Sequence, residues 1–219
     1  MPTDYKKEWI EKSAIDYFSP FISLWLACNS WYMSHYSDLN DNHAGDKKAT
    51  DREFINKLKE DNTSRNHLYI KFTELIDKTG KDGISFRTDI ELLHYALNRA
   101  NLKTDKLGNC SLENTVINYN EYQNNKGKDE ADKNESGKPV CLIKTPKINK
   151  NGSVHASDKA NVIKLDQIFI TSNRQHCFAG LFEIIYQVRN MLVHGKLNPD
   201  KDEHDVVKYC YRILWELMN

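Results

Sequence analysis

The chain has 219 residues, of which 39% are hydrophobic and 28% charged, enough for one large domain or for one domain that carries an insertion. Lysine plus arginine and aspartate plus glutamate each number 31, so the zero net charge argues against a general nucleic-acid coat, although not against a local basic site. Five scattered cysteines without a C-x-x-C pair favour a reducing cytoplasm over a disulfide framework. No apolar run approaches the length of about 20 residues that a membrane helix needs, so a cytoplasmic protein is expected.

The first part of the chain has the apolar spacing of amphipathic helices. Helices are expected at residues 4–18 and 19–36, the second opened by Ser19 as N-cap and Pro20 at the first helical position. This second helix carries the chain's densest aromatic stripe, which we interpret as core because its period fits one buried face. Asn29 interrupts the stripe, so its side chain is either exposed or directed at a neighbouring site.

Three more helices are predicted before residue 101. Thr50 to Glu53 form a capping box that opens the first of them. The second is expected at residues 66–78, with Gly80 and Gly83 ending it, and the third at residues 89–100.

The composition changes between about residues 103 and 160. Two β-prone runs, 115–122 and 139–144, flank a charged segment at 123–138, which we interpret as a solvated tip because its acids balance its bases. Residues 161–169 are compatible with a strand or a short helix. The predicted fold is therefore mainly α: a single-domain helical bundle interrupted by a β-hairpin or partly flexible insertion at about 103–160.

Polar residues gather at the end of the next predicted helix. Arg189, Asn190 and His194 follow a strongly apolar face, and Gly195 is the expected helix stop. Arginine matches phosphate oxygens with a rigid set of donors, and histidine transfers protons near neutral pH. The alternative is a helix C-terminus whose basic residues only satisfy carbonyl groups and the helix dipole. A last amphipathic helix is expected at 203–218.

The sequence contains no motif that indicates a metal site or a nucleotide-binding loop. The eight histidines include no H-E-x-x-H pattern and no zinc-site spacing. No glycine-rich phosphate loop precedes a helix. We therefore expect no metal and no cofactor.

The segment Arg189-Asn190-Met191-Leu192-Val193-His194 resembles the R-x-x-x-x-H motif of the HEPN superfamily, including the asparagine that follows the arginine in many members. The resemblance implies a helical bundle, often a homodimer, and a metal-independent endoribonuclease of bacterial defence or toxin–antitoxin systems. Arg189 and His194 would be the catalytic pair and Asn190 would assist them. Lys196 and, more weakly, Asn29 would contact the RNA substrate, and an antitoxin or defence-complex protein would be a further partner.

Two alternatives remain open beside this interpretation. One is a catalytically inactive HEPN-like module that binds RNA, nucleotides or a partner protein. The other is a purely structural helical dimer in which Arg189 pairs with a carboxylate such as Asp205. The chain also departs from those HEPN toxins that carry a modifiable tyrosine two residues after the histidine, because that position is Lys196.

Overall fold

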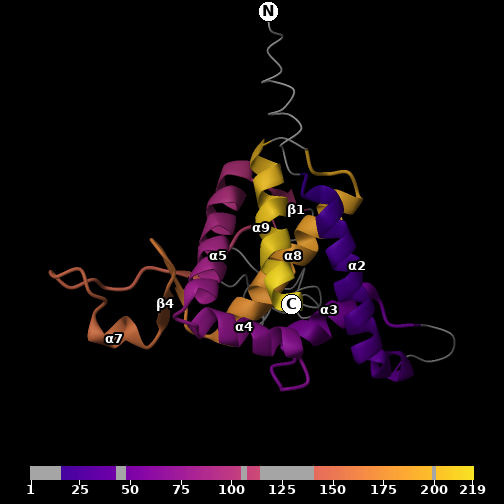
Figure 1. The fold of residues 1–219 in the computed structure, drawn as a ribbon, viewed down its shortest axis with the longest axis horizontal. Coiled ribbons are helices and arrows are strands. Elements are labelled where there is room, and N and C mark those ends of the chain that lie inside the picture. The colour runs from indigo at the N-terminus through magenta and orange to yellow at the C-terminus, as the bar shows by residue number, and fades with distance from the viewer. Residues whose placement is uncertain (1–15, 43–47, 105–107, 114–140, 199–200) are drawn as a thin grey trace, which may run out of the picture.

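The computed structural model describes residues 16–42, 48–104, 108–113, 141–198 and 201–219, which are mainly helical (Figure 1). The longer helices are α2 (Phe18–His35), α3 (Asp51–Glu60), α4 (His67–Asp77), α5 (Lys81–Ala100), α8 (Arg174–Val193) and α9 (Lys201–Met218). A 3-10 helix (Ser37–Asn42) follows α2, and α7 (Ala156–Lys159) is a single turn. The strands are β1 (Lys103–Thr104), β2 (Gly108–Asn109), β3 (Ile143–Lys144), β4 (Val162–Lys164) and β5 (Phe169–Thr171).

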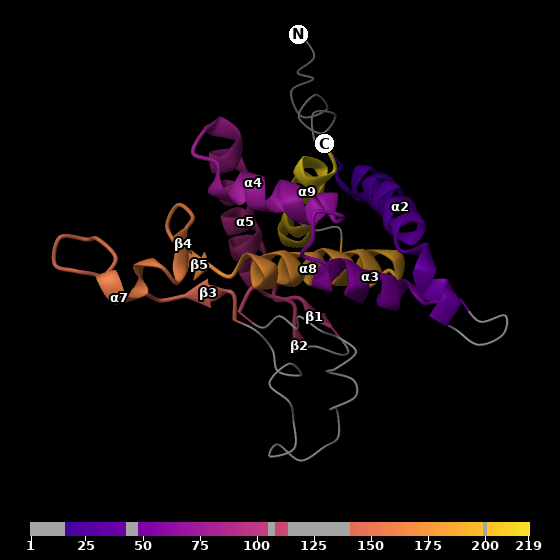
Figure 2. The ribbon, with the colours of Figure 1, turned by 90° about the horizontal axis from the view of Figure 1, so that it is seen from below.

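Helix α8 is the central element of the fold. Every residue from Cys177 to Val188 is buried, so this helix is enclosed on all sides rather than amphipathic. Helix α9 packs against α5 and α2, and α8 contacts α3, α4, α9 and α2. Figure 1 shows α9 between α5 and α2, and Figure 2 shows α8 running beside α3 beneath them.

The predicted aromatic core of the second helix is confirmed. Phe21, Trp25, Cys28 and Tyr32 are buried along one face of α2, as the helical period indicated. The predicted start of this helix is wrong by two residues, because Tyr17 is the N-cap in place of Ser19. The region predicted as the first helix lies largely outside the described residues.

Helix boundaries in the first half follow local chemistry in most places. Thr50 and Glu53 form the predicted capping box, with each side chain bonded to the backbone N–H of the other. The predicted end of the 66–78 helix before Gly80 is confirmed, because α4 ends at Asp77. Gly83, however, lies inside the next helix, which begins at Lys81 and not at the predicted residue 89. A Cβ at Gly83 would lie 2.1 Å from the carbonyl oxygen of Lys78, so glycine lets α5 start against the end of α4.

In the described residues, two small antiparallel sheets lie in the predicted insertion and in the segment that follows it, residues 161–171. Strands β1 and β2 pair with each other, and β3, β5 and β4 form a three-stranded sheet in that order. The predicted partner of the 139–144 run lies at 115–122, outside the described residues, and β3 pairs instead with β5. The open choice at residues 161–169 is decided in favour of strand, because β4 occupies 162–164.

Candidate functional site

Arg189 lies near the end of α8, where α8 meets α2 and α3. Its Nη1 donates a hydrogen bond of 2.7 Å to Oδ1 of Asn190 and lies 3.4 Å from Oδ2 of Asp51. Its Cζ lies 5.3 Å from the ring centre of Trp25 and 6.0 Å from that of Tyr186, within the range of cation–π attraction. Nε and Nη2 have no hydrogen-bond partner in the part of the chain that the structure describes. The side chain is 21% exposed, so a solute can reach these donors.

Asp51, the first residue of α3, joins several polar groups around Arg189. The Tyr32 hydroxyl donates to its Oδ1 at 2.5 Å, and the amide of Asn29 donates to the same oxygen at 3.2 Å. Burial, followed by the hydrogen bond to Asp51, raises the pKa of Tyr32 well above its ordinary value. Burial and the negative charge of Asp51 raise the pKa of the Cys28 thiol to about 12. Burial, aided by the aspartate, therefore keeps both groups in their protonated, uncharged forms.

Asn29, one of the weaker sequence candidates, belongs to this cluster through Asp51 and not through Arg189 directly. Its amide nitrogen lies 2.6 Å from the Tyr32 hydroxyl oxygen and 3.2 Å from the Asp51 carboxylate. The polar break in the aromatic stripe of α2 is thus directed at a neighbouring site, which was one of the two possibilities for it.

His194 lies apart from the Arg189 cluster. It is the C-cap of α8 and is exposed, and Gly195 ends the helix with φ +63°, as expected. In the described ranges, no hydrogen bond or ion pair joins the His194 side chain to Arg189 or Asn190. A separation of five residues corresponds to about 140° around a helix, so the two side chains leave it in different directions. Lys196 is exposed just after the helix.

The suggested pairing of Arg189 with Asp205 is wrong. Asp205 lies 3.0 Å from Nη2 of Arg99, which joins the end of α5 to the start of α9. The carboxylate partner of Arg189 is Asp51, on a different helix. Sequence reasoning missed Asp51, whose only local signal was an acidic residue in the first turn of a helix.

A buried charge network fixes α3 against α8 beside this cluster. Glu183 accepts hydrogen bonds from Arg52 at 2.7 Å, from Lys59 at 2.6 Å and from Gln187 at 2.6 Å. Burial alone would raise the pKa of Glu183, but the charges of Lys59 and Arg52 outweigh it and lower the pKa to about 2. Because Arg52 follows Asp51 directly, the same network sets where Asp51 meets Arg189.

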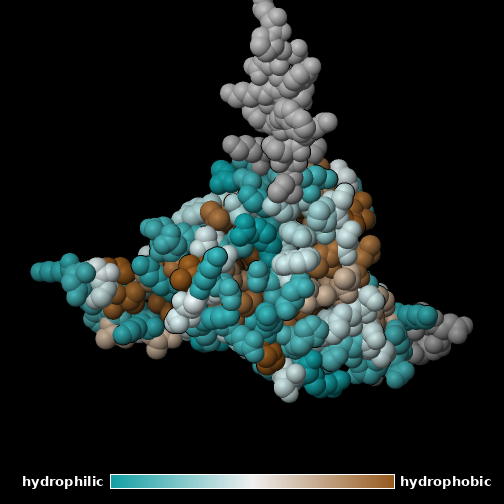
Figure 3. All heavy atoms as spheres, in the orientation of Figure 1, coloured by the Kyte–Doolittle hydropathy of each residue, from teal (hydrophilic) through white to brown (hydrophobic). Residues whose placement is uncertain are grey.

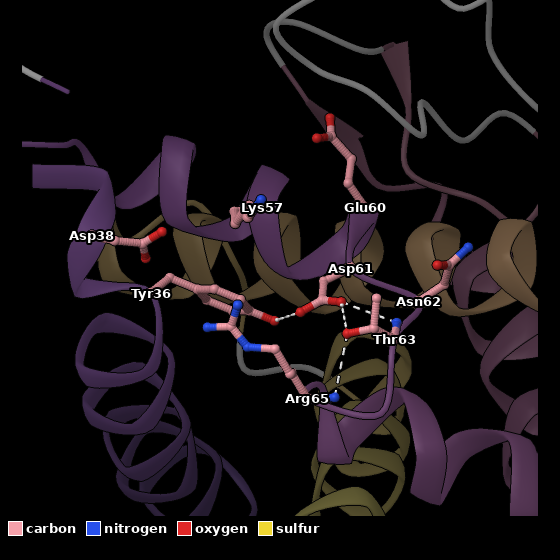
Figure 4. Close-up of a pocket in the computed structure, with 8 residues that line it drawn as sticks. All are labelled: Tyr36, Asp38, Lys57, Glu60, Asp61, Asn62, Thr63 and Arg65. Carbon is pink, nitrogen blue, oxygen red and sulfur yellow. Dashed lines mark hydrogen bonds between the residues drawn. The ribbon is translucent and has the colours of Figure 1, made fainter. Parts of the chain in front are cut away.

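A pocket of about 270 Å³ lies elsewhere, around the C-terminal ends of α2 and α3 (Figure 4). Tyr36 donates to Asp61 at 3.0 Å across it, and the other carboxylate oxygen of Asp61 accepts from the hydroxyl and the backbone N–H of Thr63. Lys57 and Arg65 also line it. None of the candidate residues predicted from sequence takes part in this pocket.

Within the described residues, no three histidine, cysteine or acidic side chains are grouped so that they could hold a metal ion. No helix in those residues is long and apolar enough to cross a membrane. No protein-family model, no curated protein and no solved structure matches the chain.

Proposed function

We propose that the protein is a metal-independent endoribonuclease of the HEPN type, acting in a bacterial defence or toxin system. The observation that carries the proposal is the set of hydrogen bonds that Arg189 makes and leaves unmade. Asp51 and Asn190 hold one of its nitrogens in place, while Nε and Nη2 have no partner in the described part of the chain. A guanidinium anchored in this way offers two donors to a phosphate without a large loss of side-chain entropy.

The proposed reaction needs no bound water or metal. The 2′-oxygen of a ribose attacks the adjacent phosphorus, the P–O5′ bond breaks, and the products carry a 2′,3′-cyclic phosphate and a 5′-hydroxyl. Arg189 stabilises the charge that develops on the non-bridging oxygens. His194 carries out one of the two proton transfers, either removing the 2′-hydroxyl proton or protonating the leaving 5′-oxygen, and solvent water carries out the other. Asn190 keeps Arg189 oriented through its 2.7 Å hydrogen bond.

A homodimer is part of the proposal because Arg189 and His194 leave α8 in different directions. A second copy would place the histidine of one chain and the arginine of the other around one phosphodiester. Exposed apolar side chains at the end of α8 and on α2 support such a contact. Val193, next to His194, is 57% exposed, and Leu26 and Met33, which share a face of α2, are 60% and 42% exposed.

The test is cleavage of labelled tRNA and single-stranded RNA in EDTA. We expect the wild type to cut and His194→Ala to be slower by a factor of about 10² to 10⁴, the usual contribution of a general acid or base. Arg189→Lys should also cleave more slowly, because the single ammonium nitrogen of lysine cannot form the bidentate hydrogen bonds that a planar guanidinium makes to a phosphate. His67→Ala and Arg65→Ala, exposed residues of the same types outside the site, serve as controls.

Two further results decide the chemistry. A substrate with 2′-deoxyribose at the cleaved position should remain intact, and the products should carry a cyclic phosphate. Wild-type protein that leaves a broad set of RNAs uncut, or His194→Ala protein that cuts as fast as wild type, would overturn the proposal.

A second candidate function is a non-catalytic module that binds RNA, nucleotides or a partner protein. It is favoured by one observation: Arg189 is already paired with Asp51, and His194 does not contact it. This candidate predicts RNA or partner binding that His194→Ala leaves unchanged, without any turnover.

A further inference from the structure

The three-stranded sheet has two chemically different faces. Ile143, Ile170 and Ile163 are directly opposite one another across β3, β5 and β4, and all three belong to the hydrophobic core or pack against it. Residues paired across antiparallel strands point to the same side, and their chain neighbours point to the other. The isoleucine row therefore lies on an inner face, and the row that follows it at Lys144 lies on the opposite, outer face, whose other end is covered because Leu142 is 2% exposed.

The outer row consists of one aromatic residue between two lysines. Lys144 of β3 and Lys164 of β4 are both paired with Phe169 of β5. The two lysines are exposed, and Phe169 is half-buried and does not belong to the core cluster. Neighbouring strands lie about 4.8 Å apart, so the two lysines begin about 10 Å from each other with the ring between them.

The surrounding lobe, residues 141–171, is basic although the whole chain has a net charge of zero. It contains five lysines and two aspartates, a net charge of +3, and all five lysines are exposed. One aspartate, Asp158, accepts a hydrogen bond of 2.8 Å from the backbone N–H of Lys147. Figures 1 and 2 show the lobe extending from the N-terminal end of α8 away from the helical bundle, and Figure 3 shows hydrophobic and hydrophilic residues side by side on it.

We infer that the outer face of this sheet binds single-stranded RNA. Phe169 stacks on one unpaired base, and Lys144 and Lys164 contact the phosphates on either side. Aromatic rings flanked by cations bind single strands in this way, because every base has a π-face and the backbone is negative. A duplex would not fit as well, since its stacked bases are not available to the ring.

The position of the sheet suits the same RNA that would be cleaved. Helix α8 starts at Arg174, three residues after β5 ends, and Arg189 lies about 22 Å further along its axis. The sheet face would thus hold the strand at one end of α8 while the phosphodiester lies at the other. The inference rests on the proposed function only for the choice of RNA as ligand, because binding can be measured without cleavage.

The experiment measures binding of a fluorescent oligouridylate of about 15 nucleotides to the full-length His194→Ala protein in EDTA. Replacing Phe169 by leucine should weaken binding about 5- to 100-fold, and Phe169→Tyr should keep it. The logarithm of the association constant falls linearly as the logarithm of the salt concentration rises, and Lys144→Gln and Lys164→Gln should each make this slope less steep by about 0.7. The matched controls are Lys150→Gln and Lys159→Gln, two exposed lysines of the lobe that lie outside the row.

Each contrary result has a distinct meaning. Equal affinity of Phe169→Leu and the parent protein would remove the stacking role and overturn the inference. Equal losses of RNA affinity in the control and row variants would show a diffuse basic surface and would also overturn the inference. Displacement of the RNA by polyglutamate of equal length would show general recognition of negative charge, with the same consequence. RNA binding that depends on Phe169 without any cleavage by the wild type would support the inference while the proposed function fails. RNA cleavage by the wild type that Phe169→Leu leaves unaffected would support the proposed function while the inference fails.

Discussion

The guanidinium of Arg189 in α8 lies 3.4 Å from the carboxylate of Asp51 at the start of α3. These residues are 138 positions apart in the chain, and the next residue along α3, Arg52, reaches back to Glu183 in the core of α8. The Arg52–Glu183 pair is buried and the Arg189–Asp51 pair is partly exposed, so the two should differ in how much they contribute to the free energy of unfolding. The buried one orders the helices, and the exposed one keeps Arg189 in a fixed position at the surface.

The partly exposed pair should contribute little to stability. Asp51 is 30% exposed and Arg189 21%, and pairs in contact with water are worth at most about 1 kcal/mol. A double-mutant cycle with Asp51→Asn and Arg189→Gln, followed by chemical denaturation, should give a coupling energy below about 1 kcal/mol. A coupling of several kcal/mol would instead assign Arg189 a structural role and weaken the case for a phosphate-binding arginine.

The buried pair should be indispensable for folding. Glu183→Ala would leave Arg52 and Lys59 without their counter-charge in the interior, and we expect a loss of about 3–5 kcal/mol in the free energy of unfolding. The matched control is Asp77→Ala, which removes an ion pair to Arg174 whose two side chains are 49% and 39% exposed. Its expected cost is below about 1 kcal/mol. Similar losses in the two variants would contradict the assignment.

Acid should destabilise the protein through Glu183. Its pKa in the folded state is about 2, below the ordinary value of 4.5, so its contribution is complete above the ordinary value and is lost as pH falls toward 2. The shift corresponds to about 3 kcal/mol. Denaturation measured between about pH 6 and pH 3 should show this decline, and the decline should be smaller in Glu183→Gln. An identical pH dependence in both proteins would show that other carboxylates cause it.

A side chain at Gly83 should destabilise the fold more than one at Gly80. A methyl group at Gly83 would lie 2.1 Å from the carbonyl oxygen of Lys78, whereas nothing lies within 4 Å of one at Gly80. We expect Gly83→Ala to cost about 1–3 kcal/mol, the usual penalty for overpacking, and Gly80→Ala less than about 1 kcal/mol. Thermal denaturation of both variants checks this, and equal melting temperatures would contradict it.

Local chemistry was enough to predict much of the helical framework. The capping box at Thr50, the stop at Gly195 and the buried stripe from Phe21 to Tyr36 each depend on residues within a few positions of one another. For the same reason the sequence indicated that Arg189 and Asn190 would be neighbours on one helix. The HEPN interpretation and its assignment of His194 stay a prediction.

The partners across the fold were decided only by tertiary structure. Lys59 is a charged residue that sequence reasoning would place in solvent, yet it is fully buried against Glu183, 124 positions away. Asp51 likewise gave no sign that it would meet Arg189, and β3 paired with β5 beyond the predicted insertion. Periodicity tells which face of an element is buried, but not which other element covers it. That choice depends on the packing of the whole chain, because distant groups lower each other's free energy only after the backbone has brought them together.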